Sequence, residues 1–337
     1  MIPDILQRLH AREHLSAEQA EALMDALMEG QLTDAQIGGV LVGLSMKGET
    51  VDELTGCARA MRKRLTPVEA HRRPLVDTCG TGGDRSGTFN ISTTAAFVVA
   101  GAGLAVAKHG NRSASSRSGS AEVLQALGVS IDMGPEAAAR AIDEVGIGFL
   151  FAPRYHGSMR YAAGPRRELG VRTLFNLVGP LTNPAGADVQ VVGVPRREFL
   201  PLVAGALARL GTRSAWVVHG AGGIDELSLA GESWVVEIRE GRLLERTVIP
   251  EDAGLGRADL EAVRGGDPAE NAAITRAVLA GERGPRRDIV LLNAAAALVA
   301  AGVAADLREG VARAAEAIDR GQASRSLEAL AALGSGA

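Results

Sequence analysis

Apolar residues in the first 66 positions recur every three or four residues, the spacing that places them on one face of a helix. Three such segments each begin at a capping box, in which a Ser or Thr and a Gln or Glu three residues later satisfy each other's backbone N–H groups. The boxes are Ser16 with Gln19, Thr33 with Gln36, and Thr50 with Glu53. The pattern predicts a small helical unit, suited to packing or dimerisation, with no catalytic cluster.

From residue 74 the pattern changes, and short apolar runs alternate with helical segments. The strand candidates are Leu75–Val76, Leu104–Ala107, Gly148–Phe151, Val189–Val194 and Ser214–His219. The helical segments include Ala121–Leu127, Pro135–Val145 and Glu198–Leu210. This alternation predicts an α/β fold, with a mainly parallel sheet and helices on both faces. Right-handed crossovers would bring the carboxyl ends of the strands, and the loops that follow them, to one edge.

Three later regions depart from this alternation. Residues 160–187 read as a helical, Arg-rich piece punctuated by proline, and we expect it to return to the N-terminal helices. Trp234–Ile238 and Leu243–Val248 read as an antiparallel hairpin that turns at Glu240–Gly241. From Pro268 onward the chain reads as helical.

The composition argues against several classes of protein. Of the 337 residues 46% are hydrophobic but only 3% are aromatic, so the core must consist mainly of Ala, Val and Leu. The net charge is −4 and no basic run is interleaved with aromatic residues, which argues against nucleic acid as a partner. Two cysteines are too few for a disulfide framework, and no apolar run reaches the roughly 20 residues of a membrane span. We therefore expect a cytoplasmic protein with no membrane partner.

Residues 76–120 contain most of the candidate ligand-binding residues. The stretch opens with Gly80, Gly82 and Gly83, whose backbone N–H groups can approach a ligand closely. Asn90–Thr93 reads as the start of a helix, whose unpaired N–H groups and positive dipole end attract an anion. The glycines lack the Lys-Ser/Thr ending of a nucleotide P-loop and the spacing of a dinucleotide fold. Alone, they would indicate no more than a tight turn.

A second segment, KHGNRSASSRSGS, begins with Lys-His-Gly at the end of the next strand candidate and continues as a serine-rich loop. Its cations are Lys108, Arg112 and Arg117, and its serines supply hydroxyl donors. Lysine is rare in this arginine-rich chain, which singles out Lys108 as a place where a compact ammonium is needed. We interpret the two loops as a diphosphate cradle, with Ser92 as a hydroxyl ligand for phosphate or Mg²⁺. His109 either orients a ligand or bonds a backbone group.

Two further features lie outside this stretch. Asp225 and Glu226 are adjacent carboxylates in a glycine-rich loop, which suits Mg²⁺ and equally suits the first turn of a helix. Arg166 can pair bidentately with a carboxylate, but Arg167 and Arg172 lie close by. The sequence alone leaves open which of these arginines is functional.

Together these motifs resemble the anthranilate phosphoribosyltransferase family across nearly the whole chain. The resemblance is carried by MKGET, GTGGD, TFNIST, KHGNR with its serines, FLFAPRYH, RRELGVRTLFNLVGPLTNPA and the loop ending in IDELS. It implies a glycosyltransferase (pentosyltransferase) that moves the phosphoribosyl group of 5-phospho-α-D-ribose 1-diphosphate (PRPP) to anthranilate and releases diphosphate. This reaction is the second step of tryptophan biosynthesis from chorismate.

The resemblance also implies an organisation. Residues 1–70, with helices from about 160–187, would form a small helical domain that makes a homodimer. Residues 71–159 and 188–337 would form a large α/β domain of the nucleoside phosphorylase and phosphoribosyltransferase type, which holds the PRPP site.

Individual roles follow from the same resemblance. The PRPP site would comprise Gly80, Gly83, Asp84, Thr88, Asn90, Ile91, Ser92, Thr93, Lys108, His109, Gly110, Asn111, Arg112, Ser113, Ala114, Ser115, Ser116 and Ser120. Mg²⁺ would bind Ser92, Asp225 and Glu226, and anthranilate would contact Gly80, Asn111 and Arg166. The catalytic residues would be Lys108, Asn111 and Arg166, with Lys108 and Mg²⁺ neutralising the departing diphosphate. Arg85 stands where the family commonly has glycine, and Gly222 where Asp is frequent.

Two other functions are compatible with parts of this pattern. A pyrimidine nucleoside phosphorylase shares the fold type but would use phosphate and a nucleoside, and the KHGNR loop and the Asp225–Glu226 pair favour a diphosphate substrate. An inactive, family-like binding protein that holds nucleic acid should be basic and should have lost its metal and acceptor residues. This chain is acidic and keeps Asp225, Glu226 and Arg166.

Overall fold

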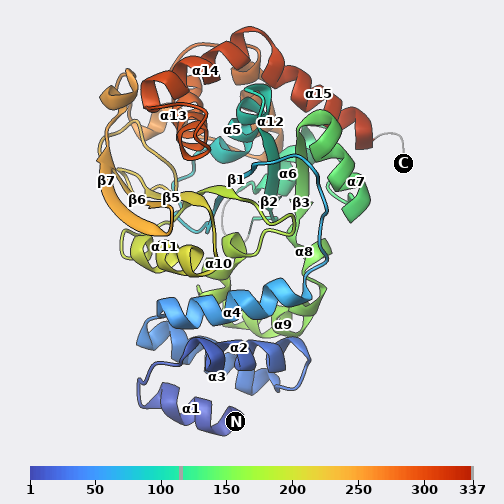
Figure 1. Ribbon diagram of the computed structural model, residues 1–337, viewed down its shortest axis with the longest axis vertical. Helices are drawn as coiled ribbons and strands as arrows, with labels where there is room; N and C mark the ends of the chain where they lie inside the picture. The colour runs from blue at the N-terminus through green and yellow to red at the C-terminus, as the bar shows by residue number, and fades with distance from the viewer. Residues whose placement is uncertain (114–116, 335–337) are drawn as a thin grey trace.

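The computed structural model describes residues 1–113 and 117–334. A stack of helices forms one end of the molecule, and a sheet covered by helices forms the other (Figure 1). The stack contains α1 (Ile2–His10), α2 (Ala17–Met28), α3 (Asp34–Lys47), α4 (Val51–Arg64) and, from later in the chain, α9 (Arg160–Leu169). No helix among the described residues is long and apolar enough to cross a membrane.

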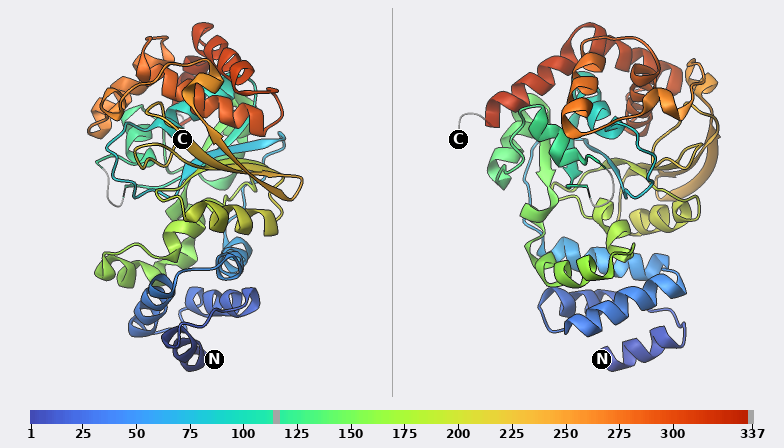
Figure 2. Two further views of the ribbon diagram at one scale, coloured as in Figure 1. Left: turned by 90° about the vertical axis from the view of Figure 1, so that its left-hand side faces the viewer. Right: turned by 180° about the vertical axis from the view of Figure 1, so that it is seen from behind.

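The capping boxes define the helix starts as predicted. Ser16, Thr33 and Thr50 each accept a hydrogen bond from the backbone three residues on, and α2, α3 and α4 begin directly after them. The expected return of the 160–187 segment is also confirmed, because α9 packs against α2 and α3. The approach is close: a Cβ added at Gly30 would lie 2.7 Å from the ring of Tyr161. Figure 2 shows α9 beside the N-terminal helices from two further sides.

A buried ion pair joins the loops of the helical stack. The side chains of Lys47 and Glu53 are only 2% and 0% exposed, and Lys47 Nζ lies 2.9 Å from Glu53 Oε2. The same carboxylate accepts the backbone N–H of Leu15 (2.9 Å) and of Thr50 (2.9 Å). Glu53 therefore ties the α1–α2 and α3–α4 connections to the start of α4.

The sheet has seven strands in the order β3-β2-β1-β4-β5-β6-β7. The strands are β1 (Leu75–Gly80), β2 (Ala105–Gly110), β3 (Ile147–Phe151), β4 (Val189–Gly193), β5 (Ser214–His219), β6 (Ser233–Arg239) and β7 (Arg242–Val248). β1 to β5 pair in parallel, and β6 and β7 form the predicted antiparallel hairpin. The predicted α/β class is therefore confirmed.

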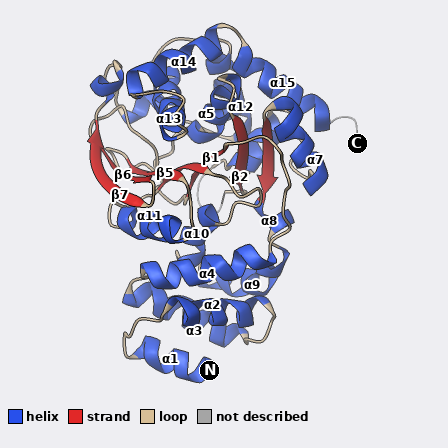
Figure 3. Cartoon of the chain, viewed as in Figure 1, coloured by secondary structure: helices blue, strands red, loops and turns tan. Residues whose placement is uncertain are grey.

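Helices cover both faces of the sheet, as Figure 3 shows. One face meets the helices that follow β1 and the C-terminal helices: α5 (Ile91–Gly101), α12 (Pro268–Leu279), α13 (Pro285–Ala300), α14 (Leu307–Asp319) and α15 (Gln322–Gly334). The other meets α10 (Leu174–Val178) and α11 (Phe199–Arg209), and the apolar core on this side is continuous with that of the helical stack. The short helices α6 (Ser120–Ala126), α7 (Pro135–Arg140) and α8 (Ala152–Tyr155) flank β2 and β3.

Two strands extend beyond the apolar runs that predicted them. β1 continues through Asp77 to Gly80, and β2 continues through Lys108 and His109 to Gly110. The predicted position of Lys108, His109 and Gly110 at the end of a strand is therefore confirmed, although the strand candidate Leu104–Ala107 ended before them. Polar residues fit inside the sheet because they pair: buried Asp77 accepts the side-chain amide of Asn183 (2.8 Å) and the backbone N–H of His109 (3.1 Å).

Replacing Glu53 with Gln is expected to lower the free energy of unfolding by about 3 kcal/mol, because it leaves the Lys47 ammonium buried without a counter-charge. The control Glu13→Gln removes an exposed partner of Arg8 and should change that energy by less than about 0.5 kcal/mol. Urea denaturation measures both. Equal effects of the two substitutions would contradict the role assigned to the buried pair.

Candidate active site at the carboxyl edge of the sheet

A cavity of about 330 Å³ lies where the loops after β1, β2 and β5 meet α9 and α10. It gathers residues that the sequence analysis took from four separate segments. The predicted residues that line it are Gly80, Gly83, Asn90, Ser92, Thr93, Lys108, His109, Gly110, Asn111, Arg112, Ser113, Ser120, Arg166, Asp225 and Glu226. The carboxyl ends of the strands thus bring the candidate site together, as expected for an α/β sheet.

Other predicted site residues do not line this cavity. Ile91 is buried in the core, because it occupies the inward face of α5. Asp84 and Thr88 contact each other through Ser86, whose hydroxyl lies 2.5 Å from Asp84 Oδ2 and 3.2 Å from Thr88 Oγ1. Ala114, Ser115 and Ser116 lie outside the described residues.

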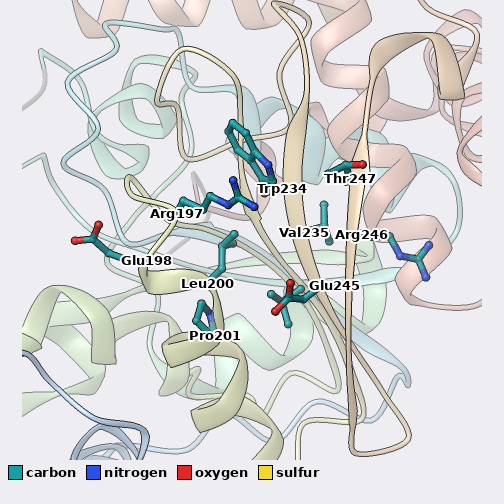
Figure 4. A pocket seen from close by; sticks show the side chains of 10 residues that line it. Arg197, Glu198, Leu200, Pro201, Trp234, Val235, Glu245, Arg246 and Thr247 are labelled. Carbon is teal, nitrogen blue, oxygen red and sulfur yellow. The ribbon is translucent and has the colours of Figure 1, made fainter.

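A larger cavity, of about 550 Å³, lies between α11 and the β6–β7 hairpin (Figure 4). Arg197 covers the ring of Trp234 there at 4.7 Å from the ring centroid, and Glu198 and Glu245 contribute carboxylates. None of the predicted site residues lines it. Volume alone therefore does not identify the chemical site.

The glycine loop after β1 presses against the loop that carries Asp225. The Gly82 N–H donates to Asp225 Oδ2 (3.1 Å). A Cβ added at Gly80 would lie 2.5 Å from that same oxygen, and one at Gly193 would lie 1.6 Å from the Asp225 carbonyl. These glycines are needed because any side chain would separate the two loops.

The start of α5 holds the second carboxylate. The Ser92 N–H, at the amino end of this helix, donates to Glu226 Oε1 (3.0 Å). Asn90 precedes the helix, and its side-chain amide reaches the Ser118 carbonyl (3.3 Å). The loop after β2 is thereby tied to the start of α5.

Asp225 and Glu226 belong to the loop between β5 and β6 and not to a helix start, which removes one of their two interpretations. Burial raises the pKa of Asp225 to about 7, with a further contribution from Asp84. Burial and then the charge of Asp225 raise the pKa of Glu226 to about 8. In the described part of the chain no basic side chain forms an ion pair with either carboxylate.

This donor set fits a hard divalent cation. Mg²⁺ keeps several water ligands and is bound by one or two carboxylates together with substrate phosphates. Within residues 1–113 and 117–334, no group of three or more His, Cys, Asp or Glu side chains could hold a metal by itself. Two buried carboxylates with raised pKa values are therefore suited to a cation that arrives with an anionic substrate.

Lys108 is a buried cation near the end of β2. It is 3% exposed, and its Nζ donates to the Thr78 carbonyl at 2.5 Å. Burial lowers its pKa, whereas the nearby carboxylates of Asp77 and Glu226 act in the opposite direction. The ammonium reaches the cavity from within the sheet, so its charge is only weakly screened by solvent.

His109 lies beside His156, a residue that the sequence analysis did not select. The two Nε2 atoms are 3.3 Å apart, and both rings are buried. Burial lowers the pKa of His109 to about 3 and that of His156 to about 4. Both imidazoles are therefore neutral at physiological pH, and one can donate a hydrogen bond to the other.

Arg166 projects from α9 into the cavity and lies over the ring of Phe175, with Cζ 4.9 Å from the ring centroid. Among the described residues no carboxylate lies within ion-pair distance of it, and burial lowers its pKa. Arg167 is exposed, and Arg172 bonds the glycine loop instead. Arg166 is thus the arginine whose charge remains available to a ligand in the cavity.

The sequence analysis missed several lining residues because they carry no distinctive chemistry. They are Cys79, Thr81, Gly119, Ala152, Phe175, Asn176, Gly179 and Pro180. Phe175 to Pro180 lie within the long motif RRELGVRTLFNLVGPLTNPA, which was the available signal. Their apolar surfaces suit a flat aromatic molecule.

The two departures from the family pattern have backbone consequences. Arg85 is exposed, does not line the cavity, and adopts a φ of 57°, a conformation in which glycine is favoured. Gly222 has a φ of +85°, and a Cβ there would lie 2.3 Å from Leu260 Cδ1. In this chain an Asp at position 222 would therefore be strained.

Comparisons with known proteins agree with this geometry. The chain matches the glycosyl transferase family a/b domain over residues 72–324 and the helical bundle domain of the same family over residues 3–65. It is 55% identical to the anthranilate phosphoribosyltransferase of Moorella thermoacetica over 332 residues, which cover 98% of each chain. The enzyme of Thioalkalivibrio sulfidiphilus is also 55% identical, over 97% of this chain and 98% of its own.

Solved structures give the same result. Anthranilate phosphoribosyltransferase from Thermus thermophilus matches with a TM-score of 0.92 at 50% identity, covering 98% of this chain and 99% of its own. The Saccharomyces cerevisiae enzyme, in complex with PRPP and Mg, matches with a TM-score of 0.92 at 26% identity, covering 100% and 98%. This chain therefore belongs to the anthranilate phosphoribosyltransferase family.

Proposed function

We propose that the protein transfers the phosphoribosyl group of PRPP to the amine of anthranilate, giving N-(5-phosphoribosyl)anthranilate and diphosphate. This is the pentosyl transfer of the second step of tryptophan biosynthesis. One observation carries the proposal: a single cavity joins the glycine loop, the Asp225–Glu226 pair and the free guanidinium of Arg166. Groups suited to bind an anion, a metal ion and a carboxylate thus line the same cavity.

The donor half of the site is formed by the loops after β1 and β2. Gly80 and Gly83 line it with little side-chain bulk, and Lys108 contributes a buried positive charge. Asn111 and Arg112 lie at its exposed side. We assign the other residues of these two loops that line the cavity to PRPP binding, as the family resemblance implies.

Asp225, Glu226 and Ser92 are the residues that would hold Mg²⁺. When bound, the ion would neutralise charge on the diphosphate as it departs. The Gly82 N–H donates to Asp225, so the glycine loop lies directly beside a carboxylate that would hold Mg²⁺.

The acceptor half is formed by α9, α10 and Asn111. A carboxylate of anthranilate would pair with Arg166, while its ring would lie against Phe175 and Pro180. This pairing places the amine toward the donor half. In the transfer, the bond from ribose C1 to diphosphate oxygen breaks and a bond from C1 to nitrogen forms, with loss of one amine proton. Positioning of two reactants supplies much of the rate enhancement in such a reaction.

The direct test measures the fluorescence of anthranilate in the presence of PRPP and Mg²⁺. Time-dependent loss of fluorescence, with release of diphosphate, is expected. Incubation with thymidine and phosphate tests the nucleoside phosphorylase alternative and should release no thymine. Thymine release without anthranilate consumption would overturn the proposal, and absence of both activities would favour the inactive binding protein.

Arg166→Ala should raise KM for anthranilate about tenfold or more, because it removes a charge-assisted pair with the carboxylate. KM for PRPP should change far less, since Arg166 belongs to the acceptor half. Arg167→Ala, an exposed neighbour on the same helix, is the matched control and should leave both constants unchanged. An unaltered KM for anthranilate in Arg166→Ala would remove this residue from the acceptor site.

Mg²⁺ should stabilise the protein more at pH 8 than at pH 6. In the unfolded chain both carboxylates ionise near about pH 4, whereas burial raises the pKa of Asp225 to about 7 and of Glu226 to about 8. Between about pH 4 and these raised pKa values, the folded protein without Mg²⁺ keeps both carboxyl groups protonated, whereas the unfolded chain releases the protons. The free energy of unfolding therefore falls as pH rises through this range. Mg²⁺ competes with those protons and therefore binds more tightly at higher pH.

Differential scanning fluorimetry with and without Mg²⁺ measures this effect as a rise in Tm. The double variant Asp225→Asn with Glu226→Gln should show no Mg²⁺-dependent rise at either pH, and it should lose most Mg²⁺-dependent turnover. A rise in Tm of equal size in the double variant would place the metal elsewhere.

We further propose that residues 1–70 with the helices of 160–187 form the dimerisation domain. Gly39, Val42 and Met46 follow one another at helical spacing on the outer side of α3, and Met46 is 72% exposed. A groove of about 330 Å³ runs beside them between α3 and α1 and includes Leu6 and Leu9. An exposed apolar stripe of this kind is suited to a second copy of the chain.

Sedimentation velocity should show a dimer for the unmodified protein and a monomer for Met46→Glu, because the new charge would be buried in the interface. Leu243→Glu is the control, since Leu243 is also exposed (45%) but lies on β7. It should remain dimeric. A dimer that persists in Met46→Glu would refute this interface.

A further inference from the structure

Arg172 lies in the short connection between α9 and α10. The chain reverses at Gly170, which has a φ of 60° and ends α9, and Arg172 then extends back toward the sheet. Its Nη1 donates to the Gly82 carbonyl (2.6 Å), and its Nη2 donates to Thr81 Oγ1 (2.8 Å). One guanidinium therefore contacts two successive residues of the glycine loop.

The guanidinium of Arg172 also packs on an aromatic ring, which fixes its orientation. Its Cζ lies 5.2 Å from the ring centroid of Phe199, the first residue of α11. Arg196 lies over the same ring at 4.3 Å, but it pairs with Glu198 (3.0 Å). Stacking on a fixed ring orients the planar fork of Arg172, which a lysine ammonium would not reproduce.

The loop that Arg172 holds needs external support. Gly82 and Gly83 have φ values of 64° and 83°, and glycines lose more conformational freedom on ordering than any other residue. On one side the loop is fixed by Asp225, which accepts the Gly82 N–H. On the other side it is fixed by Arg172, which binds the Gly82 carbonyl.

Asp225 and Arg172, which support the loop from two sides, have different roles in the proposed reaction. Asp225 is one of the residues that would hold Mg²⁺, whereas Arg172 contacts the loop and does not line the cavity. We propose that Arg172 is a positioning residue that keeps the Thr81–Gly83 backbone in place, so that the loop binds the diphosphate of PRPP. This inference rests on the proposed function for the identity of the ligand.

The position of Arg172 also connects the two halves of the site. It follows α9, which carries Arg166, and its guanidinium meets the donor loop. Glu49 of the α3–α4 connection lies near enough for its charge to act on Arg172. The residue thus links the helical stack to the loop without lining the cavity itself.

The test compares Arg172→Ala and Arg172→Lys with the control Arg167→Ala. Both Arg172 variants should raise KM for PRPP about tenfold or more, the effect of losing hydrogen bonds from a charged donor. KM for anthranilate and kcat at saturating PRPP should change less than about twofold. Added guanidinium ion should restore part of the PRPP affinity in Arg172→Ala. A raised KM for anthranilate alone, or unchanged KM values, would overturn the proposal.

Isothermal titration calorimetry of each protein variant with PRPP, in the presence of Mg²⁺ and without anthranilate, measures the same loss of affinity without turnover. If the unmodified protein consumed no anthranilate, the proposed function would fail, but weaker PRPP binding in Arg172→Ala would still support the positioning role. Thr81→Val keeps the arginine and removes one of its two acceptors, so it provides a second variant should Arg172→Ala not fold. It should weaken PRPP binding by a smaller factor, and unchanged binding would count against the proposal.

Discussion

The burial of two adjacent carboxylates is the constraint on which the rest of the site depends. Asp225 and Glu226 each accept a backbone N–H, from Gly82 and Ser92, which is little compensation for a buried charge. Their raised pKa values follow from that shortfall. The glycines around them are required because only a bare backbone can approach so closely. A divalent cation with a diphosphate would supply the missing charge, so the arrangement that costs the metal-free protein stability also selects its ligands.

The acceptor side is positioned by packing. The apolar core of α1 to α4 and α9 continues beneath the sheet into the core around α11, so the helical stack and the sheet are packed against each other. Arg166 therefore reaches the cavity from a helix that is fixed on the N-terminal helices, and Arg172 returns from the end of that helix to the donor loop. The groups proposed for the donor and for the acceptor are held by different segments that share one core.

Local signals predicted the fold well, and long-range pairing accounts for what they missed. The capping boxes and the alternation of runs are short-range patterns, and they correctly predicted the N-terminal helices and the mainly parallel sheet. The strand candidate ended at Ala107 because nothing local shows that Asp77 and Thr78, on the neighbouring strand, make Lys108 a buried residue. Likewise, Arg166 and Arg172 look alike in the sequence, and only the reversal at Gly170 gives them different partners. The proposed metal-binding pair stands out in the sequence because adjacent carboxylates in a glycine loop are a local feature.

The most direct test of this account is a crystal structure of the protein with PRPP and Mg²⁺. The account predicts a metal ion on Asp225 and Glu226, with the diphosphate against the Gly80–Gly83 loop in the cavity that Arg166 also lines. A diphosphate bound away from this loop, or a metal ion with neither carboxylate among its ligands, would contradict it.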